Sequence, residues 1–300
     1  MHSLRFFSNA EVAERLSYPQ LIEALRIGLA KPCSAPLRSC HALPAQASLL
    51  QMPVWQAGEG IGVKLVTVFP GNGARGLPAV AAVFALFDGE DGRPLALLEA
   101  SELTARRTAC SSALAADYLV RDDARRLLVV GCGTLAAHMV RAHACVRDYR
   151  HIDIWGRDPA KAAALAARLR AEGYPARAAD GLRAAVEAAD CVSCVTTSRE
   201  ALVRGAWLKP GVHLDLVGAF LPSMRETDAL AVARARVVVD TRAGALEEAG
   251  DLLQAISTEL RDLLGGAGRR GDPGEITLFK SVGYALEDLV AARRVVDNAA

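Results

Sequence analysis

The sequence predicts an α/β fold in which a parallel-sheet domain is inserted into an α+β domain made from both chain ends. From Arg126 onward, short apolar strands alternate with amphipathic helices, which is typical of a parallel sheet. Before Leu98, apolar strands follow one another between glycine and proline clusters, which is typical of an antiparallel sheet. We therefore predict one domain over residues 1–110, completed by 281–300, and a second over 111–280.

Composition limits the possible functions. The 300 residues, 52% of them hydrophobic, are enough for two domains with buried cores. The 35 basic and 34 acidic residues give a net charge of +1, which favours a small-molecule ligand over nucleic acid. Seven scattered cysteines predict neither a disulfide framework nor a metal site. Without a signal-peptide core or the roughly 18 apolar residues of a membrane span, we expect a cytoplasmic protein.

The first third of the chain predicts a helix followed by strands. A short strand leads to a cap near Ser8 or Asn9, and apolar residues then recur at helical spacing to about residue 30. Thr104 is expected to cap a further helix that reaches Leu119. The strands predicted between these helices are 47–52, 62–67, 79–87 and 94–98.

The remainder alternates between strands and helices. The predicted strands are 127–130, 151–155, 191–196, 212–217 and 237–240. The predicted helices are 134–146, 159–172, 181–188, 245–253, 258–264 and 281–298. The glycine-rich stretch 265–274 is predicted to be a flexible loop, to which the sequence assigns no role.

The run Gly131-Cys132-Gly133-Thr134-Leu135-Ala136 matches G-x-G-x-x-A between an apolar strand and a helix. Gly131 permits the tight turn, Gly133 lets the backbone approach a pyrophosphate, and Ala136 allows close helix packing. Amide groups at the helix start, including those of Thr134 and Leu135, are expected to receive the phosphates. The second domain is thus predicted to be a Rossmann dinucleotide-binding domain.

The turn after the second Rossmann strand bears on the choice of cofactor. NAD-binding proteins commonly place an acidic residue there, but this sequence has Gly156 followed by Arg157. An arginine suits the 2′-phosphate of NADP, so NADP(H) is favoured over NAD(H). In the alternative, Arg157 is a solvated loop charge and Asp158 merely caps the next helix.

Several segments resemble the ornithine cyclodeaminase/mu-crystallin family in the same order. They are the glycine turn and the segments 62–66, 103–109 (L-T-A-R-R-T-A), 217–219 and 279–283. The resemblance covers nearly the whole chain, and the L-T-A-x-R-T-A run is its most specific element. It implies a homodimer in which the amino-terminal β region pairs across subunits.

The resemblance also implies a substrate site. Arg38, Lys64 and Arg107 match residues that bind the substrate carboxylate and surround the reacting nitrogen, and Lys64 and Arg107 are the predicted catalytic residues. A guanidinium is geometrically matched to a carboxylate, and a lysine in an apolar strand is costly unless it meets an anion. In the alternative, Lys64 is an edge-strand lysine that points to water.

Further positions are implied to contact the cofactor. Thr108 and Ser111 resemble positions near the phosphates, whereas residues that end strands are expected beside the ribose and nicotinamide. The strand-end positions are Thr196, Thr197, Ser198, Val217, Gly218, Val282 and Gly283. For the pairs Val217–Gly218 and Val282–Gly283, simple core packing is the alternative.

One departure from the family favours reduction over deamination. Members that deaminate ornithine carry an aspartate where this chain has Phe220, and a phenyl ring cannot do acid–base chemistry. Asp215 or Glu226 could replace it only within hydrogen-bond reach. The prediction is NAD(P)H-dependent reduction of a cyclic ketimine, such as Δ1-pyrroline-2-carboxylate or Δ1-piperideine-2-carboxylate. The alternatives are ornithine cyclodeamination, alanine dehydrogenase-like oxidation and non-catalytic binding of a dinucleotide or small ligand.

Overall fold

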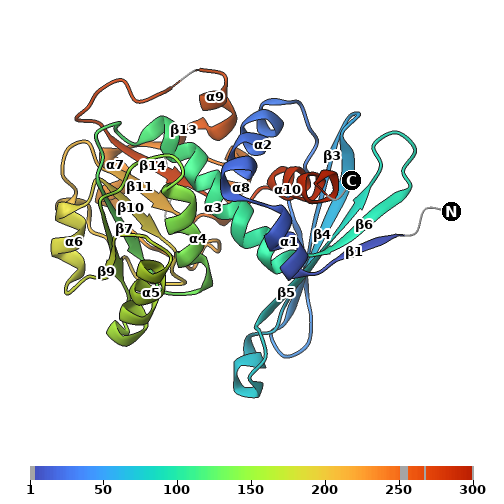
Figure 1. Cartoon of the computed structure of the whole chain (residues 1–300), viewed down its shortest axis with the longest axis horizontal. Coiled ribbons are helices and arrows are strands. Elements are labelled where there is room, and N and C mark those ends of the chain that lie inside the picture. Colours follow the sequence, from blue (N-terminus) through green and yellow to red (C-terminus); the bar gives the residue numbers. More distant parts are fainter. Residues whose placement is uncertain (1–3, 251–255, 267, 299–300) are drawn as a thin grey trace. The chain divides into compact units, whose positions relative to one another are not determined.

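The computed structural model describes residues 4–250, 256–266 and 268–298, which form two compact units (Figure 1). The first unit joins Met1–Arg107 to Tyr284–Ala300, and the second comprises Thr108–Gly283. The predicted α/β class is confirmed. The roles assigned to 1–110 with 281–300, substrate binding and dimerisation, stay predictions, as does cofactor binding by 111–280.

In its described residues, the first unit contains a six-stranded sheet in the order β1-β6-β5-β4-β3-β2. Neighbouring strands are antiparallel as predicted, except that β1 pairs with β6 in parallel. The strand β2 was not predicted, and the short helix η1 (Pro70–Arg75) occupies a predicted turn. The strands are β1 (Arg5–Phe7), β2 (Ser39–Ala42), β3 (Ser48–Gln56), β4 (Gly60–Val68), β5 (Val80–Phe87) and β6 (Pro94–Glu99).

The chain is helical to about residue 30 as predicted, but it forms two helices, α1 (Asn9–Arg15) and α2 (Tyr18–Ala30). Leu16 leaves the helical conformation, and Ser17 then starts α2 with a proline in its first turn. The predicted cap at Ser8 is confirmed. Its hydroxyl accepts from the Glu11 amide at 3.4 Å while the Glu11 carboxylate accepts from the Ser8 amide at 2.9 Å, which is a capping box.

The helix α3 (Ala100–Leu119) begins before Thr104, so the prediction of Thr104 as its cap is wrong. The first turn is instead capped from a distant segment. The Asn9 side-chain oxygen accepts from the Glu102 amide at 2.9 Å, although 93 positions separate the two residues. Local sequence signals cannot show such a cap.

The described part of the second unit contains an eight-stranded sheet in the order β13-β12-β14-β11-β10-β7-β8-β9, and every paired neighbour is parallel. The strand order reverses between β7 and β10, where Rossmann folds bind dinucleotides. β9 and β14 were not predicted, and β13 replaces the start of a predicted helix over 258–264. The strands are β7 (Arg126–Val130), β8 (His151–Trp155), β9 (Ala176–Ala178), β10 (Cys191–Cys194), β11 (His213–Leu216), β12 (Ala235–Val239), β13 (Ile256–Glu259) and β14 (Ile276–Lys280).

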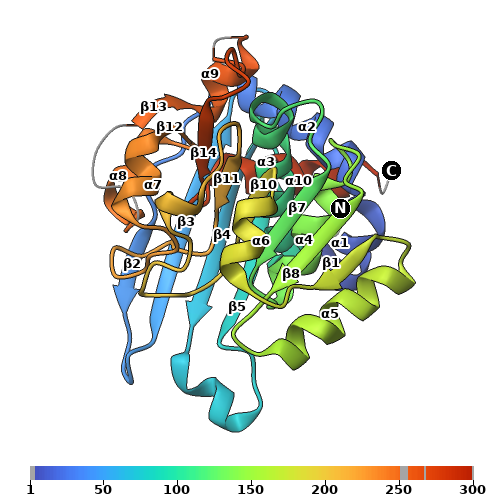
Figure 2. The same cartoon turned by 90° about the vertical axis from the view of Figure 1, so that its left-hand side faces the viewer.

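Helices pack on both faces of this sheet (Figure 2). Because strand side chains alternate, Leu127 and Val129 pack with α4 and α5, whereas Leu128 and Val130 pack with the helices of the other face. The predicted helix 245–253 begins earlier, and its residues 251–253 lie outside the described residues. The helices and short helical turns of this unit are α4 (Thr134–His143), α5 (Pro159–Ala171), α6 (Leu182–Ala188), η2 (Gly205–Trp207), α7 (Ala229–Arg234), α8 (Arg242–Glu248) and α9 (Leu260–Leu264).

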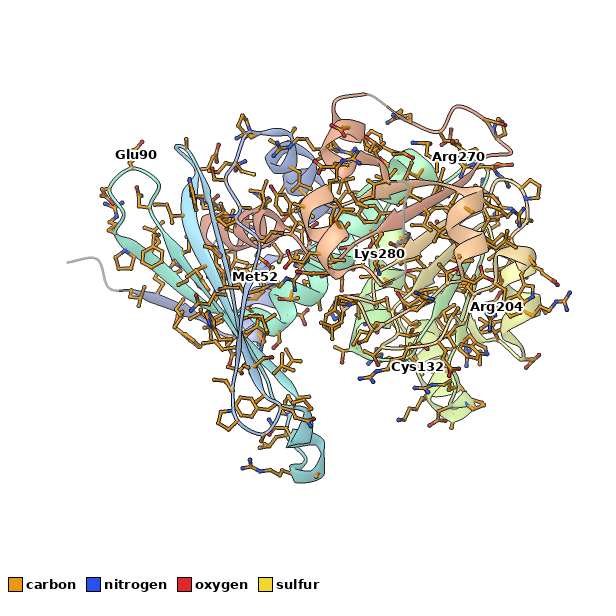
Figure 3. All side chains as sticks on the ribbon, turned by 180° about the vertical axis from the view of Figure 1, so that it is seen from behind. Met52, Glu90, Cys132, Arg204, Arg270 and Lys280 are labelled. Atoms are coloured by element: carbon orange, nitrogen blue, oxygen red, sulfur yellow. The ribbon has the colours of Figure 1, made fainter. Side chains whose placement is uncertain are left out.

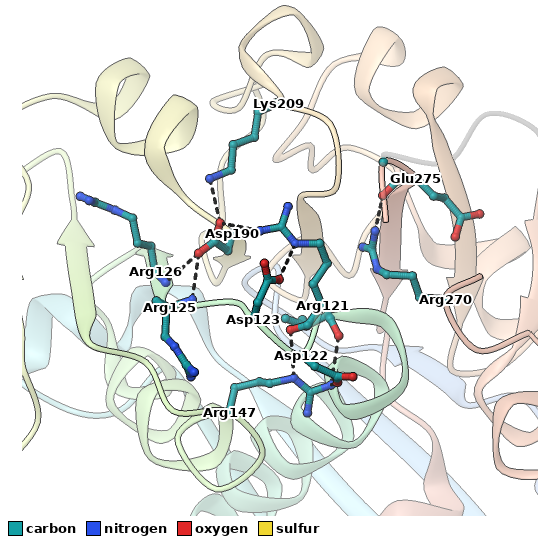
Figure 4. A network of polar contacts seen from close by, with 12 residues as sticks. Arg121, Asp122, Asp123, Arg125, Arg126, Arg147, Asp190, Lys209, Arg270 and Glu275 are labelled. Atoms are coloured by element: carbon teal, nitrogen blue, oxygen red, sulfur yellow. Dashed lines mark hydrogen bonds and ion pairs between the residues drawn. The ribbon is translucent and has the colours of Figure 1, made fainter. Parts of the chain in front are cut away.

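Ion pairs and hydrogen bonds tie together the starts of these strands (Figure 4). The Asp190 carboxylate accepts from the Arg125 and Arg126 amides at 2.9 and 3.0 Å and from Lys209 Nζ at 2.8 Å. Burial raises the pKa of Asp190, but Lys209 and the two amides outweigh it, so the pKa lies below its ordinary value. Arg270, from the predicted loop 265–274, donates to the Leu119 carbonyl at 2.7 Å. These contacts hold the amino-terminal ends of the central strands together.

The helix α10 (Ala285–Asp297) returns to the first unit and packs against α2, β3 and β4. It begins four residues later than predicted. None of the helices in the described residues is long and apolar enough to cross a membrane.

Candidate functional site

Buried charges gather on the inner face of the sheet in the first unit. Lys64 Nζ lies 2.7 Å from Asp288 Oδ2, and Arg107 Nε donates to Asp288 Oδ1 at 3.0 Å. Arg107 Nη1 donates to Glu287 Oε2 at 2.7 Å. Lys64 is 2% exposed and Arg107 4%, while both carboxylates are fully buried. We call Lys64, Arg107, Glu287 and Asp288 the buried ion cluster.

The local sequence explains how the cluster forms. Lys64 lies on β4 between Met52 and Phe84 of the neighbouring strands, on the sheet face that packs against α10. The two carboxylates occupy the first turn of α10, where uncapped helix amides favour negative charge. The helix therefore supplies the anions that a lysine in an apolar strand needs, and Lys64 does not point to water.

Burial lowers the pKa of Lys64 to about 8. Asp288 opposes this shift, and the positive charges of Arg107 and Arg38 add to it. Arg38, which is half-buried in the loop before β2, is therefore close enough to act on Lys64 electrostatically. Arg38 thus adds a third positive charge near the two cations and two carboxylates of the cluster.

Glu287 and Asp288 are not among the residues predicted from the sequence. A signal was present, because two adjacent acids open a helix whose residues 285–292 are all buried. Sequence periodicity identifies such a helix as amphipathic but does not show that its first turn is buried. Acids in a buried turn require cationic partners.

In the second unit, the glycine turn fits a dinucleotide. Gly131 has φ of 126°, its amide donates to the Trp155 carbonyl at 2.7 Å, and an added Cβ would lie 2.9 Å from the Val195 oxygen. A Cβ at Gly133 would meet nothing within 4 Å, and no side chain caps the start of α4. The exposed backbone there leaves room and amide donors for a pyrophosphate. Of the other predicted positions, Thr134 is exposed, Leu135 half-buried and Ala136 buried, and Cys132 lies on the same turn (Figure 3).

The turn after β8 separates two charges. Asp158 accepts from the Ala160 and Lys161 amides at 3.0 and 3.3 Å and thereby caps α5. Arg157 is exposed, and it makes no hydrogen bond or ion pair with any described residue. The carboxylate is thus committed to the helix, whereas the guanidinium remains available to a ligand.

A buried carboxylate joins the loops that follow β10 and β11. Glu226 Oε1 accepts from the Thr196 amide and hydroxyl at 2.6 and 3.0 Å, and Oε2 accepts from the Gly218 and Ala219 amides at 2.8 and 3.2 Å. A Cβ at Gly218 would lie 2.2 Å from the Thr196 nitrogen, so only glycine permits this approach. Val217 is buried beside it.

A second carboxylate fixes the loop after β14. Asp240 Oδ2 accepts from the Ser281 hydroxyl and from the Val282 and Gly283 amides at 3.1, 2.8 and 2.7 Å. Its Oδ1 accepts from the Thr241 amide at 2.7 Å. The predicted pairs Val217–Gly218 and Val282–Gly283 are therefore both held by buried carboxylates at the carboxyl ends of strands.

The remaining residues predicted to bind the cofactor are Thr197, Ser198, Thr108 and Ser111. Thr197 is exposed, and the Ser198 hydroxyl donates to the Glu200 carbonyl at 2.7 Å within its own turn. Thr108 and Ser111 are buried in α3. No hydrogen bond joins the Thr108 side chain to the glycine turn within the described residues.

Neither acid considered as a replacement at Phe220 is available for proton transfer. Glu226 accepts four hydrogen bonds, as described above. Asp215 is fully buried in β11, where it accepts from the Ser193 hydroxyl at 2.7 Å and lies 3.2 Å from His143 Nε2. Burial lowers the pKa of His143, but Cys191 and Asp215 outweigh it and raise the pKa to about 10.

Known proteins resemble this chain over nearly its whole length. The model of the ornithine cyclodeaminase/mu-crystallin family matches residues 6–300. Δ1-Pyrroline-2-carboxylate reductase of Paracoccus denitrificans is 39% identical over 300 residues, covering 96% of this chain and 95% of the relative.

Two solved structures share the fold over 99% of this chain. The first is Δ1-pyrroline-2-carboxylate reductase of Thermococcus litoralis in complex with NADH and L-proline, with a TM-score of 0.94, 30% identity and 97% of that chain covered. The second is an archaeal alanine dehydrogenase dimer with bound NAD, with a TM-score of 0.92, 26% identity and 96% covered. With its sequence matched from residue 6 to residue 300, the chain belongs to the ornithine cyclodeaminase/mu-crystallin family.

Proposed function

We propose that this protein is an NAD(P)H-dependent oxidoreductase that reduces a cyclic ketimine carboxylate, such as Δ1-pyrroline-2-carboxylate or Δ1-piperideine-2-carboxylate, to the cyclic amino acid. The observation that carries the proposal is the buried ion cluster, in which two cations meet two carboxylates beside Arg38 and which holds a lysine whose pKa is about 8. The relatives named above support the same reaction class.

In the proposed mechanism, Arg38 and Arg107 bind the substrate carboxylate, which orients the ring and its C=N bond. Lys64 holds a proton that it can give to the ring nitrogen, because its pKa of about 8 is near neutrality. The reduced dinucleotide, when bound, supplies the hydride that C2 of the ketimine accepts. Burial of Lys64 and Arg107 limits water around these charges and strengthens them.

Reduction is favoured over ornithine cyclodeamination because the required acid is missing. The Phe220 side chain, which is 40% exposed, has no ionisable group. Asp215 and Glu226 already make the contacts described above. Reduction of a ketimine needs one proton on the ring nitrogen, which Lys64 can supply, together with the hydride.

Dinucleotide absorbance, followed with both ketimines, tests the proposal. We expect rapid loss of NADPH or NADH absorbance on addition of substrate and formation of the cyclic amino acid. A parallel reaction contains L-ornithine, NAD and an ammonia detector. Ammonia release from ornithine without ketimine reduction would overturn the proposal and identify a cyclodeaminase.

Arg157 is proposed to favour NADP(H) over NAD(H), because its guanidinium is exposed and has no partner in the described residues. We expect Arg157→Ala to raise the KM for NADPH by about 10- to 100-fold, through loss of a charge-assisted contact, and to leave the KM for NADH within about twofold. Steady-state kinetics with both cofactors measure this. Exposed Arg199→Ala is the control, and an equal rise for both cofactors would contradict the assignment.

We also propose that the outer face of the first unit's sheet forms the homodimer interface. The inner face is covered by α10, whereas the opposite strand positions leave apolar side chains accessible, including Phe6, Trp55 and Ile61. Exposed apolar faces of this kind mark protein contacts, and the archaeal relative is a dimer.

We expect Ile61→Glu to convert the dimer to a folded monomer, because the carboxylate would be buried at the interface but solvated in the monomer. Ile61 is 41% exposed in the single chain. Light scattering coupled to size-exclusion chromatography measures the mass, and circular dichroism checks folding. Leu246→Glu, at a 74% exposed position on α8, should stay dimeric. A dimeric Ile61 variant would exclude this face.

A further inference from the structure

Three buried charges lie together at the carboxyl ends of the strands in the second unit. Lys280 and Glu226 are fully buried and Asp240 is nearly so. Lys280 Nζ, at the end of β14 (Figure 3), donates to the Ala219 carbonyl at 2.5 Å. The Ala219 amide donates to Glu226, so a carboxylate binds the amide of Ala219 and an ammonium binds its carbonyl.

Both acids are surrounded by donors. Each accepts four hydrogen bonds from amides and hydroxyls, as described above. Donors aimed at both oxygens of a carboxylate complement its negative charge. With the Lys280 ammonium, the set carries a net charge of −1.

These charges are attached to the loops assigned above to the nicotinamide. Glu226 holds Gly218, Asp240 holds Val282 and Gly283, and Lys280 adjoins both loops. The nicotinamide ring is cationic when oxidised and neutral when reduced. Fixed charges beside the ring, in surroundings of low polarity, therefore bind its two forms unequally.

We propose that Glu226, Asp240 and Lys280 set the relative affinity of the protein for oxidised and reduced dinucleotide, with the net negative charge favouring the oxidised, cationic ring. The inference rests on the proposed function, since it requires the nicotinamide at these loops. When the reduced nicotinamide gives up its hydride, the ring becomes cationic. Stabilising this positive charge makes the bound dinucleotide a better hydride donor and so favours reduction of the substrate. Lys280 opposes the two acids and limits the bias.

The Lys280 variants separate charge from shape. Lys280→Gln removes the charge but keeps a donor for the Ala219 carbonyl, Lys280→Arg keeps the charge, and Lys280→Met removes both. Full-length protein is titrated with oxidised and with reduced dinucleotide, without substrate, and protein and dinucleotide fluorescence give the two dissociation constants. The quantity compared is the ratio of the constant for the oxidised form to that for the reduced form.

We expect Lys280→Gln to lower this ratio by about tenfold, because a unit charge opposing the cationic ring is lost. Lys280→Arg should leave the ratio within about twofold of wild type, and Lys280→Met should shift it in the same direction as Lys280→Gln. Glu226→Gln and Asp240→Asn should each raise the ratio. Lys209→Gln, which removes a lysine at the strand starts, is the matched control and should leave the ratio unchanged.

The sign of the change decides the outcome. Equal weakening of both forms in Lys280→Gln and Asp240→Asn would mean that the residues only shape the loops, and the inference would be wrong. A shift of the ratio in the same direction in both variants would also overturn it. A wild-type protein that binds neither form would instead contradict the proposed cofactor site itself, so the two failures are distinguishable.

Discussion

Replacement of Arg107 by methionine is expected to abolish measurable ketimine reduction and to lower the free energy of unfolding by about 3–5 kcal/mol. Arg107 bonds to Asp288 and Glu287, both fully buried, and the variant leaves two carboxylates with Lys64 as their cationic partner in the cluster. Removal of one partner from a buried ion pair is strongly destabilising. Urea denaturation measures the stability, and ketimine-dependent loss of NADPH absorbance measures the activity.

A second substitution distinguishes the two effects. Adding Glu287→Gln to the Arg107 variant leaves Lys64 facing one buried carboxylate, Asp288, instead of two, so we expect it to recover a large part of the stability. Activity should not return, because the guanidinium proposed to bind substrate is still absent. Recovery of both properties would show that Arg107 serves the fold alone.

Replacement of Lys64 by methionine is expected to lower kcat by about 100- to 10,000-fold, the usual contribution of a general acid. In wild type, the rate of reduction should fall as the pH rises through about 8, because Lys64 then loses the proton that it donates. The variant should lack this decline. The measurement is kcat for ketimine reduction between pH 6 and 10, values chosen to bracket the pKa at roughly two units either side.

Stability should change in the opposite direction over the same range. The folded pKa of about 8 lies below the ordinary value of 10.5, so between these values the unfolded chain binds the proton more strongly than the folded chain. The contribution of Lys64 to stability therefore rises with pH from about 8 to 10.5. A fall in kcat above pH 8 with no fall in the free energy of unfolding would thus assign the fall in kcat to deprotonation of Lys64. A pH profile that survives in Lys64→Met would exclude it as the acid.

The features predictable from sequence were those encoded locally. The strand-turn-helix pattern around Gly131 predicted the dinucleotide fold, and the cap at Ser8 depends on residues three positions apart. The cap of α3 depends on Asn9, 93 positions away, and β14 is buried on both faces, so its sequence lacks the alternation of a half-buried strand.

The candidate site follows the same division. Lys64 could be selected because an ammonium is unusual in an apolar strand. Its partner Asp288 lies in a helix whose packing position the sequence does not give. Glu226 remained open as an acid because its role depends on amides of two separate loops. Long-range hydrogen bonds, which leave no periodic signal, decided both cases.

The order of the buried ion cluster along the chain has a consequence for protein synthesis. Arg107 and Asp288 are 181 positions apart, so a ribosome completes the entire second unit before it adds the acids that neutralise Lys64 and Arg107. Until then, Lys64 on β4 and Arg107 on α3 lack the Glu287 and Asp288 carboxylates, and the sheet of the first unit lacks α10. Polypeptides released before α10 is made should be recognised by chaperones and proteases as unfinished, because α10 completes both the core of the first unit and the buried ion cluster.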